Sequence, residues 1–311
     1  MATINTIDTL SVENQTFYDR TLLERELPEL HLYEDADKKS IPKGKGTEVS
    51  FRKFSSLKVP ATSLSEGVTP AGSNLEITEI KAKAKQEGDY VKVSDVLDMQ
   101  GKDPVITETS ELCGEQAALT VDTRIRDVIG NGTTVQYANN KVGRANLTDT
   151  DILTSIEIRK AKKRLKKSNI LPFADGYYHM LISPDQEFDL KSDESKIGFV
   201  EVAKYAASEK LLTGEIGRYD GVRICASSNV EVVKQGSVNV HKALLYGRHA
   251  YGVVDVESQG AKAKIIVKPL GSGGTDDPLN QRATIGWKAM FIAVRLNELG
   301  ICRVETGASA V

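Results

Sequence analysis

Cysteine, histidine and aromatic residues are scarce in this chain of 311 residues, which has three cysteines, four histidines and 6% aromatic side chains. Cys113, Cys225 and Cys302 form no C-x-x-C pair, and no histidine lies near them at the spacing of metal ligands. Their number and spacing argue against a disulfide framework and against a zinc site. We interpret them as small buried apolar groups in a protein of a reducing compartment.

Net charge and long apolar runs are also lacking. The 41 basic and 43 acidic residues leave a formal charge of −2, so the overall field does not select nucleic acid or an anionic membrane as a tight ligand. No window approaches the roughly 20 apolar residues of a membrane span, and the N-terminus lacks the basic head and apolar run of a secretory signal. We therefore expect no membrane partner, and synthesis and assembly in the cytosol.

Catalytic motifs are missing as well. The glycine-rich stretch at residues 271–274 lacks the Gly-Lys-Ser or Gly-Lys-Thr of a phosphate-binding loop, and Asp276 and Asp277 after it would repel phosphate. The chain has no G-x-S-x-G for a serine nucleophile and no H-E-x-x-H for a metal. We predict no catalytic residue, no cofactor and no metal site. An enzyme would require a cluster of titratable residues that the sequence does not show.

The most informative segment is polar and extended, and it spans residues 47–98. We expect strands at residues 48–54, 75–85 and 90–97, with a turn at residues 87–89 between the last two. Residues 81–85 read Lys-Ala-Lys-Ala-Lys, so one face carries only methyl groups and the other only ammonium groups. Such a ribbon buries little apolar surface alone, and a neighbouring copy of the chain is its natural support.

We predict that side chains on this segment contact neighbouring copies, because aromatic side chains on a polar ribbon have little local core to enter. The alternative is that the aromatic members pack against the spine helix of their own chain, which is predicted to follow this segment. The predicted contact residues are Phe51, Phe54, Lys81, Lys83, Lys85 and Tyr90.

A long helix is predicted directly after the ribbon. Asp103 is suited to the N-cap and Pro104 to the first helical position, and Gly130 marks the end. The helix would have about 26 residues and a length of ~39 Å, which is enough for the spine of a domain. An ordinary core helix explains the periodicity equally well, and its position directly after the ribbon favours the spine. The apolar stripe that predicts it comprises Val105, Thr109, Leu112, Val121, Ile125 and Val128.

The remaining sequence predicts alternating helices and strands. With 311 residues, of which 40% are hydrophobic, the chain is large enough for one large or two ordinary domains. Trp287 lies in the most apolar segment and is predicted to be a core residue. A short helix is expected in the polar N-terminus. The expected helices are at residues 16–27, 151–167 (capped by 148–151) and 199–212, and the expected strands at 177–183, 222–227, 243–246, 251–256, 263–270 and 285–296.

One charge cluster stands out near the C-terminal end of the helix that ends at residue 167. Cations at a helix C-terminus complement the macrodipole, so a solvated helix end explains the cluster. The alternative is a patch that faces an acidic surface of a neighbouring copy or the backbone of DNA. Its members are Arg159, Lys160, Lys162, Lys163, Arg164, Lys166 and Lys167.

Several short motifs occur in order along nearly the whole chain. They are TFYDRTLLER (16–25), GDYV (88–91), SDVL (94–97), GEQA (114–117), DGYY (175–178), GEIGR (214–218), GVR (221–223), KPLG (268–271), DPLNQRAT (277–284) and GWK (286–288). Together they resemble the major capsid protein family of tailed double-stranded-DNA phages named for the N-four type. That family is similar to the wider tailed-phage and herpesvirus shell lineage.

The resemblance implies an α+β fold with five parts and a structural function without an active site. Copies of the chain would form pentamers and hexamers of an icosahedral head shell around double-stranded DNA, held non-specifically, with a portal and scaffolding or decoration proteins as further partners. A cellular nanocompartment shell or another virion component of the tail or decoration type is the alternative. The implied parts are an N-terminal arm (1–46), an extended loop (47–98), a peripheral domain with a spine helix (99–147), an axial domain (148–255), and peripheral strands with the C-terminus (256–311).

Overall fold

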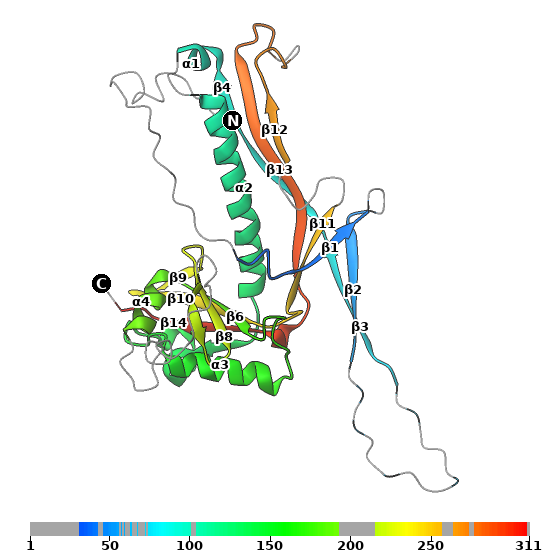
Figure 1. Ribbon diagram of the computed structural model, residues 1–311, viewed down its shortest axis with the longest axis vertical. Helices are drawn as coiled ribbons and strands as arrows, with labels where there is room; N and C mark the ends of the chain where they lie inside the picture. Colours follow the sequence, from blue (N-terminus) through cyan, green and yellow to red (C-terminus); the bar gives the residue numbers. More distant parts are fainter. Residues whose placement is uncertain are drawn as a thin grey trace.

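The structure is a computed structural model that describes residues 31–42, 46–55, 74–100, 104–192, 215–256, 264–273 and 277–309, with 57, 59, 63, 67 and 72 in between. The helices expected at residues 16–27 and 199–212 lie outside these residues, as does Asp103. Figure 1 shows one long helix beside a sheet, a second sheet at one end of that helix, and a thin ribbon that projects away from both.

The first sheet, here called the helix-backed sheet, is organised around one long strand. Strand β13 pairs with β4 on one edge and with β12 and β11 on the other, and parallel β1 completes the sheet next to β11. Its strands are β1 (Asp37–Ile41), β4 (Lys85–Ser94), β11 (Tyr251–Val256), β12 (Lys264–Lys268) and β13 (Arg282–Arg295).

Helix α2 (Val105–Gly130) lies along this sheet, and the short helix α1 (Asp95–Gln100) precedes it. Ala117, Ile125 and other residues at steps of four on α2 join Trp287 and its neighbours on β13 in one apolar core. The predicted helix is confirmed to within one residue at each end. Leu112 is a correction, because it is 46% exposed and the buried stripe passes through its neighbour Cys113 instead.

The second sheet has seven strands and packs against helix α3 (Ser155–Lys167) through a separate apolar core. Helix α3 starts later than predicted, because Asp151 accepts hydrogen bonds from the backbone and hydroxyl of Thr148 and holds a turn there. Helix α4 (Pro184–Lys191) follows one of the strands. The strands are β5 (Val135–Tyr137), β6 (Tyr178–Ile182), β7 (Glu215–Tyr219), β8 (Val222–Ala226), β9 (Val232–Gln235), β10 (Val238–Tyr246) and β14 (Ile301–Thr306).

The sheet pairings differ from the predicted domain boundaries at residues 147 and 255. Strand β5 and the late strand β14 both belong to the seven-stranded sheet, where they pair in parallel. Strand β11, by contrast, pairs with β1 and β13 in the helix-backed sheet. The chain therefore crosses between the two sheets more often than a division into consecutive segments allows.

The ribbon consists of β2 (Glu48–Phe54) and β3 (Ile77–Lys83), which pair antiparallel, and β3 leads through Ala84 into β4. The turn predicted at residues 87–89 is wrong, since β4 continues straight through Gly88. A side chain at Gly88 would collide with the backbone carbonyl of Trp287 on β13. The glycine therefore allows two strands to approach closely and does not form a turn.

The base of the ribbon has a small core of its own, which corrects the expectation that its apolar face stays uncovered. Ala82, Ala84 and Phe51 are buried against Val254 and Val294 of the helix-backed sheet. Phe51 is therefore not available as an anchor for another copy. The lysines of the Lys-Ala-Lys-Ala-Lys run are exposed on the opposite face, as predicted.

Phe51 and Phe54 provide a test of this arrangement, because they lie on opposite faces of the same strand. Phe51→Ala should lower the free energy of unfolding by about 3 kcal/mol, because it leaves a cavity in the small core. Phe54→Ala should change it by less than about 0.5 kcal/mol, since Phe54 is 61% exposed. Urea denaturation of the two variants measures both values, and equal losses would contradict the assigned faces.

Candidate assembly surfaces

The outward face of the ribbon is charged at its base and apolar further out. Cross-strand pairs of opposite charge, Glu48 with Lys83 and Arg52 with Glu79, occupy the base. Phe54 and Ile77 then form the outermost cross-strand pair of the ribbon, and both side chains are more than half exposed. Further exposed apolar side chains follow at Leu57, Val59 and Leu75.

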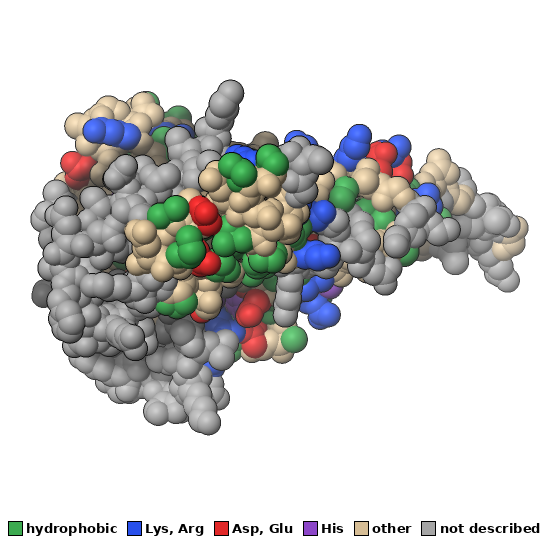
Figure 2. All heavy atoms as spheres, turned by 90° about the horizontal axis from the view of Figure 1, so that it is seen from above, with side chains coloured by type: hydrophobic (Ala, Val, Ile, Leu, Met, Phe, Trp, Pro, Cys, Tyr) green, Lys and Arg blue, Asp and Glu red, His purple; other side chains and the backbone are tan. Residues whose placement is uncertain are grey.

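This exposed apolar group, here called the ribbon patch, comprises Phe54, Leu57, Val59, Leu75 and Ile77. The elongated projection on the right of Figure 2 shows hydrophobic side chains beside basic and acidic ones. Scattered apolar residues are normal on a surface, but a group of this size on a thin projection marks a contact site for another molecule.

The predicted contact residues fall in three places, one of which is the small core at the base of the ribbon that buries Phe51. Phe54, Lys81 and Lys83 share the outward face of the ribbon. Tyr90 and Lys85 lie on β4 in the helix-backed sheet, where Tyr90 is half exposed and stands opposite Gly286 of β13. The structure thus brings together only the ribbon members, and their contacts with other copies stay a prediction.

Residues 31–41, here called the strap, were expected to belong to an arm but are built into the fold. The buried Leu32 donates its backbone N–H to Asp122 of α2, and its carbonyl accepts a hydrogen bond from the Tyr251 hydroxyl. Tyr33 donates to Asp255 of β11. No sequence pattern signalled these contacts, because each joins the strap to a residue at least 90 positions away.

His179 fixes the strap to the seven-stranded sheet. Its Nδ1 lies 2.8 Å from Asp35 of the strap, and its Nε2 lies 3.0 Å from Asp175. The ring stacks on Phe173 with 4.1 Å between centroids. Two carboxylates can both accept from this ring only when both nitrogens carry protons, so the geometry selects the imidazolium form.

The charges around this histidine agree with its protonated state. Burial lowers the pKa of His179, but hydrogen bonds and charge attraction from Asp35 and Asp175 outweigh burial and raise the pKa above its usual value. The Tyr246 hydroxyl also donates to Asp35, and Arg223 pairs with Asp175. Each carboxylate thus has a second donor that holds it in place beside the ring.

A serine, a histidine and an aspartate meet at the start of α4, an arrangement that the sequence did not reveal. The Ser183 hydroxyl lies 2.9 Å from Nδ1 of His241, and Nε2 of His241 lies 3.5 Å from Asp185. Ser183 is buried, however, and its hydroxyl caps α4 by accepting the backbone N–H of Gln186. The Ser183 hydroxyl therefore stabilises the first turn of α4 as its cap.

The seven cations of the predicted basic patch divide into paired and unpaired members. Lys162 pairs with Asp220 at 3.0 Å, and Lys160 pairs with the buried Glu157 at 2.7 Å. The Arg164 guanidinium donates to the carbonyl of Val135. The exposed members without an ion pair to a described residue are Arg159, Lys163, Lys166 and Lys167.

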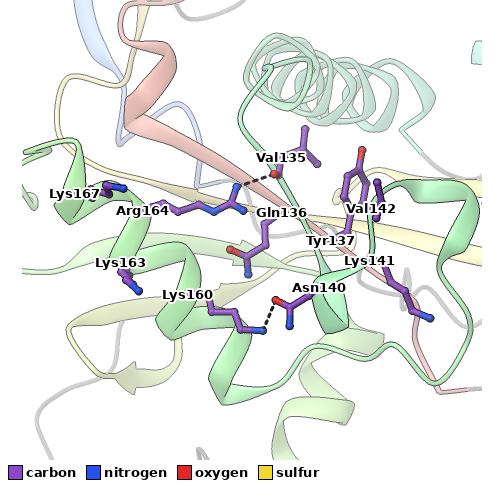
Figure 3. Close-up of a pocket in the computed structure, with 10 residues that line it drawn as sticks. All are labelled: Val135, Gln136, Tyr137, Asn140, Lys141, Val142, Lys160, Lys163, Arg164 and Lys167. Carbon is purple, nitrogen blue, oxygen red and sulfur yellow. Dashed lines mark hydrogen bonds between the residues drawn. The ribbon is translucent and has the colours of Figure 1, made fainter.

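A cavity of about 580 Å³ lies beside these cations, between α3 and residues 135–142. Figure 3 shows the basic side chains of α3 facing β5 and the following turn. Among the residues that the structure describes, no group of three or more histidine, cysteine or acidic side chains is placed to hold a metal ion. Within the same residues, none of the helices has the length and apolar character that a bilayer crossing requires.

A projecting ribbon with an exposed apolar patch is a feature of proteins that assemble with other molecules. Residues 77–304 match the family of phage capsid proteins. This match covers more than half of the chain, and the chain therefore belongs to the phage capsid protein family. It is accordingly a structural component of the virion head. Among curated proteins, none is significantly similar to the chain in sequence.

Solved capsid structures share the fold along the whole chain. The capsid of Ralstonia phage GP4 matches with a TM-score of 0.75 and 13% identity over 96% of both chains. The capsid of cyanophage Pam1 matches with a TM-score of 0.72 and 13% identity over 97% of this chain and 98% of that one. The capsid of Helicobacter pylori bacteriophage KHP30 gives 0.70 and 11% over 99% of both. The predicted fold class is confirmed.

The contact between His179 and the strap predicts a pH-dependent stability. Because the folded-state pKa lies above that of the unfolded chain, the stabilisation is complete below the unfolded pKa and is lost as the pH rises through the folded-state value. His179→Gln should lower the free energy of unfolding by about 1.5–3 kcal/mol in mild acid, because it removes charge-assisted hydrogen bonds.

Urea denaturation of the wild type and the variant at about pH 5.5 and about pH 9 measures this difference. The difference should shrink as the pH rises. A difference of the same size at both pH values would show that His179 acts through packing and not through its charge.

Proposed function

We propose that copies of this chain assemble into the pentamers and hexamers of an icosahedral head shell that encloses double-stranded DNA. In this shell the ribbon of each copy lies over a neighbouring copy. Each contact between two copies would bury about 800 Å² per partner, and closure of the shell multiplies many such modest contacts.

The ribbon patch is the observation that carries this proposal. Phe54 and Ile77 lie on the face of the ribbon opposite its small core, and both side chains are more than half exposed. Burying each of these side chains against a neighbour would contribute about 1.5–3 kcal/mol. The opposite charges at the ribbon base, such as Arg52 and Glu79, would determine the register of that contact and would add little to its affinity.

The two sheets support a division into peripheral and axial parts. The helix-backed sheet with α2 would form the peripheral domain, and the seven-stranded sheet with α3 and α4 would form the axial domain around the centre of each capsomer. The ribbon would be the projecting part of the extended loop predicted at residues 47–98, and β4 would anchor that loop in the helix-backed sheet. The strap would be the part of the predicted arm at residues 1–46 that binds to its own chain.

Partners other than the chain itself follow from the same proposal. A closed head requires a portal, and scaffolding or decoration proteins would guide or reinforce the lattice during assembly in the host cytoplasm. The exposed cations Arg159 and Lys166 on α3 would attract the DNA backbone or an acidic protein surface without reading sequence.

Replacing the outermost ribbon pair tests this function. Phe54→Gln combined with Ile77→Gln should leave the melting temperature of the chain nearly unchanged, since both side chains are exposed. The yield of closed particles should fall at least about tenfold, because the loss recurs at every contact between copies. Negative-stain electron microscopy and sedimentation velocity of the purified chain measure the yield.

Leu171→Gln combined with Leu279→Gln is the matched control, since both leucines are similarly exposed but lie outside the ribbon. This control should form particles at the wild-type yield. A ribbon variant that forms closed particles as well as the wild type would contradict the proposed role of the ribbon. Particles without a portal vertex when all phage head proteins are present would instead indicate a different kind of shell.

A further inference from the structure

The cavity between α3 and residues 135–142 concentrates positive charge on one face of a helix. Lys160, Lys163, Arg164 and Lys167 line it at spacings of three and four, so all four project from the same side of α3. Lys141 adds a fifth cation from the opposite wall. Figure 3 shows these side chains around a common space, with Lys160 bonded to Asn140 and Arg164 bonded to Val135.

Only part of this charge is neutralised within the chain. Lys160 pairs with Glu157 at 2.7 Å, and Lys141 lies 3.7 Å from Asp151. Lys163, Arg164 and Lys167 have no carboxylate partner among the described residues. Among the described residues, the five cations that line the cavity and the two carboxylates paired with them leave a surplus of three positive charges.

This surplus is unfavourable for α3 itself. Like charges three and four positions apart on a helix repel each other. Every such pair among the α3 residues that line the cavity is a pair of cations. The helix macrodipole favours cations in the last turn, which includes Arg164 and Lys167 but not Lys160 or Lys163. An anion with several charges inside the cavity would turn this repulsion into attraction.

We propose that this cavity binds a small anion with several phosphate groups, such as inorganic tripolyphosphate or the triphosphate of a nucleotide. A triphosphate carries several charges on one short chain, which suits three cations on neighbouring turns of one helix. An acidic peptide brings one charge per flexible side chain and must order each of them, at a cost in entropy. A DNA duplex lies across such an opening and cannot enter it.

Binding would matter for assembly, and this consequence rests on the proposed function. If α3 belongs to the axial domain, the surplus positive charges of all copies in a capsomer lie around one axis and repel each other. A bound polyphosphate would remove that repulsion and favour capsomer formation. The binding itself is a property of the single chain and can be measured separately.

Isothermal titration calorimetry of the purified full-length chain with tripolyphosphate, at about 50 mM salt, tests the site. Lys163→Gln combined with Lys167→Gln should weaken binding at least about tenfold, because it removes two of the three unneutralised cations. Arg159→Gln combined with Lys166→Gln is the matched control. It removes two exposed cations from the same helix outside the cavity and should bind within about twofold of the wild type.

Parallel titrations with ATP, a poly-glutamate peptide and a short DNA duplex identify the ligand. If ATP binds with the same affinity as tripolyphosphate, the site recognises only the phosphate groups. If ATP binds with higher affinity, the natural ligand is a nucleotide. Equal weakening in both double variants, or no tripolyphosphate binding by the wild type, would overturn the proposal. Tighter binding of the peptide or the duplex, with the same dependence on Lys163 and Lys167, would also overturn it. Particle yield with and without tripolyphosphate is scored separately, so a failure of assembly leaves the binding result intact.

Discussion

The contact between strand β13 and helix α2 is the constraint on which the rest of this structure depends. Strand β13 pairs with three other strands and also supplies the apolar surface against which α2 packs. Trp287 illustrates this double role, since it lies in the β13 ladder while its indole N–H donates to Gln116 of α2. A helix and a strand of this length form a rigid beam, and the ribbon projects from the strand that lies next to it.

The beam connects the seven-stranded sheet to the ribbon, and each of them is attached to it in a different way. At one end the seven-stranded sheet joins the beam in two ways. Apolar side chains of the sheet, such as Leu244, share the core of α2. The strap adds polar contacts with Asp122, His179 and Tyr246. At the base of the ribbon a small apolar core, which includes Phe51, attaches it to the helix-backed sheet. Beyond this core the apolar side chains of the ribbon are exposed and available to another copy. The inward face of β2 thus stabilises the fold of the chain, and the outward face of β2 is exposed for contact with another chain.

Local patterns predicted the regular elements well, because their causes lie close together in sequence. The apolar stripe and the glycine stop placed α2 to within one residue, and the apolar run around Trp287 identified β13. Features that depend on distant partners were missed. The turn expected at Gly88 is wrong because the glycine accommodates β13. The core that buries Phe51 was not identified because its members come from the distant strands β1, β11 and β13. The strap and the His179 contact left no local signal.

The described residues of the chain form their own apolar cores, whereas the ribbon patch requires sister copies for cover. A cryo-electron microscopy reconstruction of particles assembled from the purified chain would reveal whether it receives that cover. We expect closed icosahedral shells in which Phe54 and Ile77 of each ribbon are buried against a neighbouring subunit. Shells in which these side chains remain in solvent, or a chain that stays monomeric under all assembly conditions, would overturn this role of the ribbon.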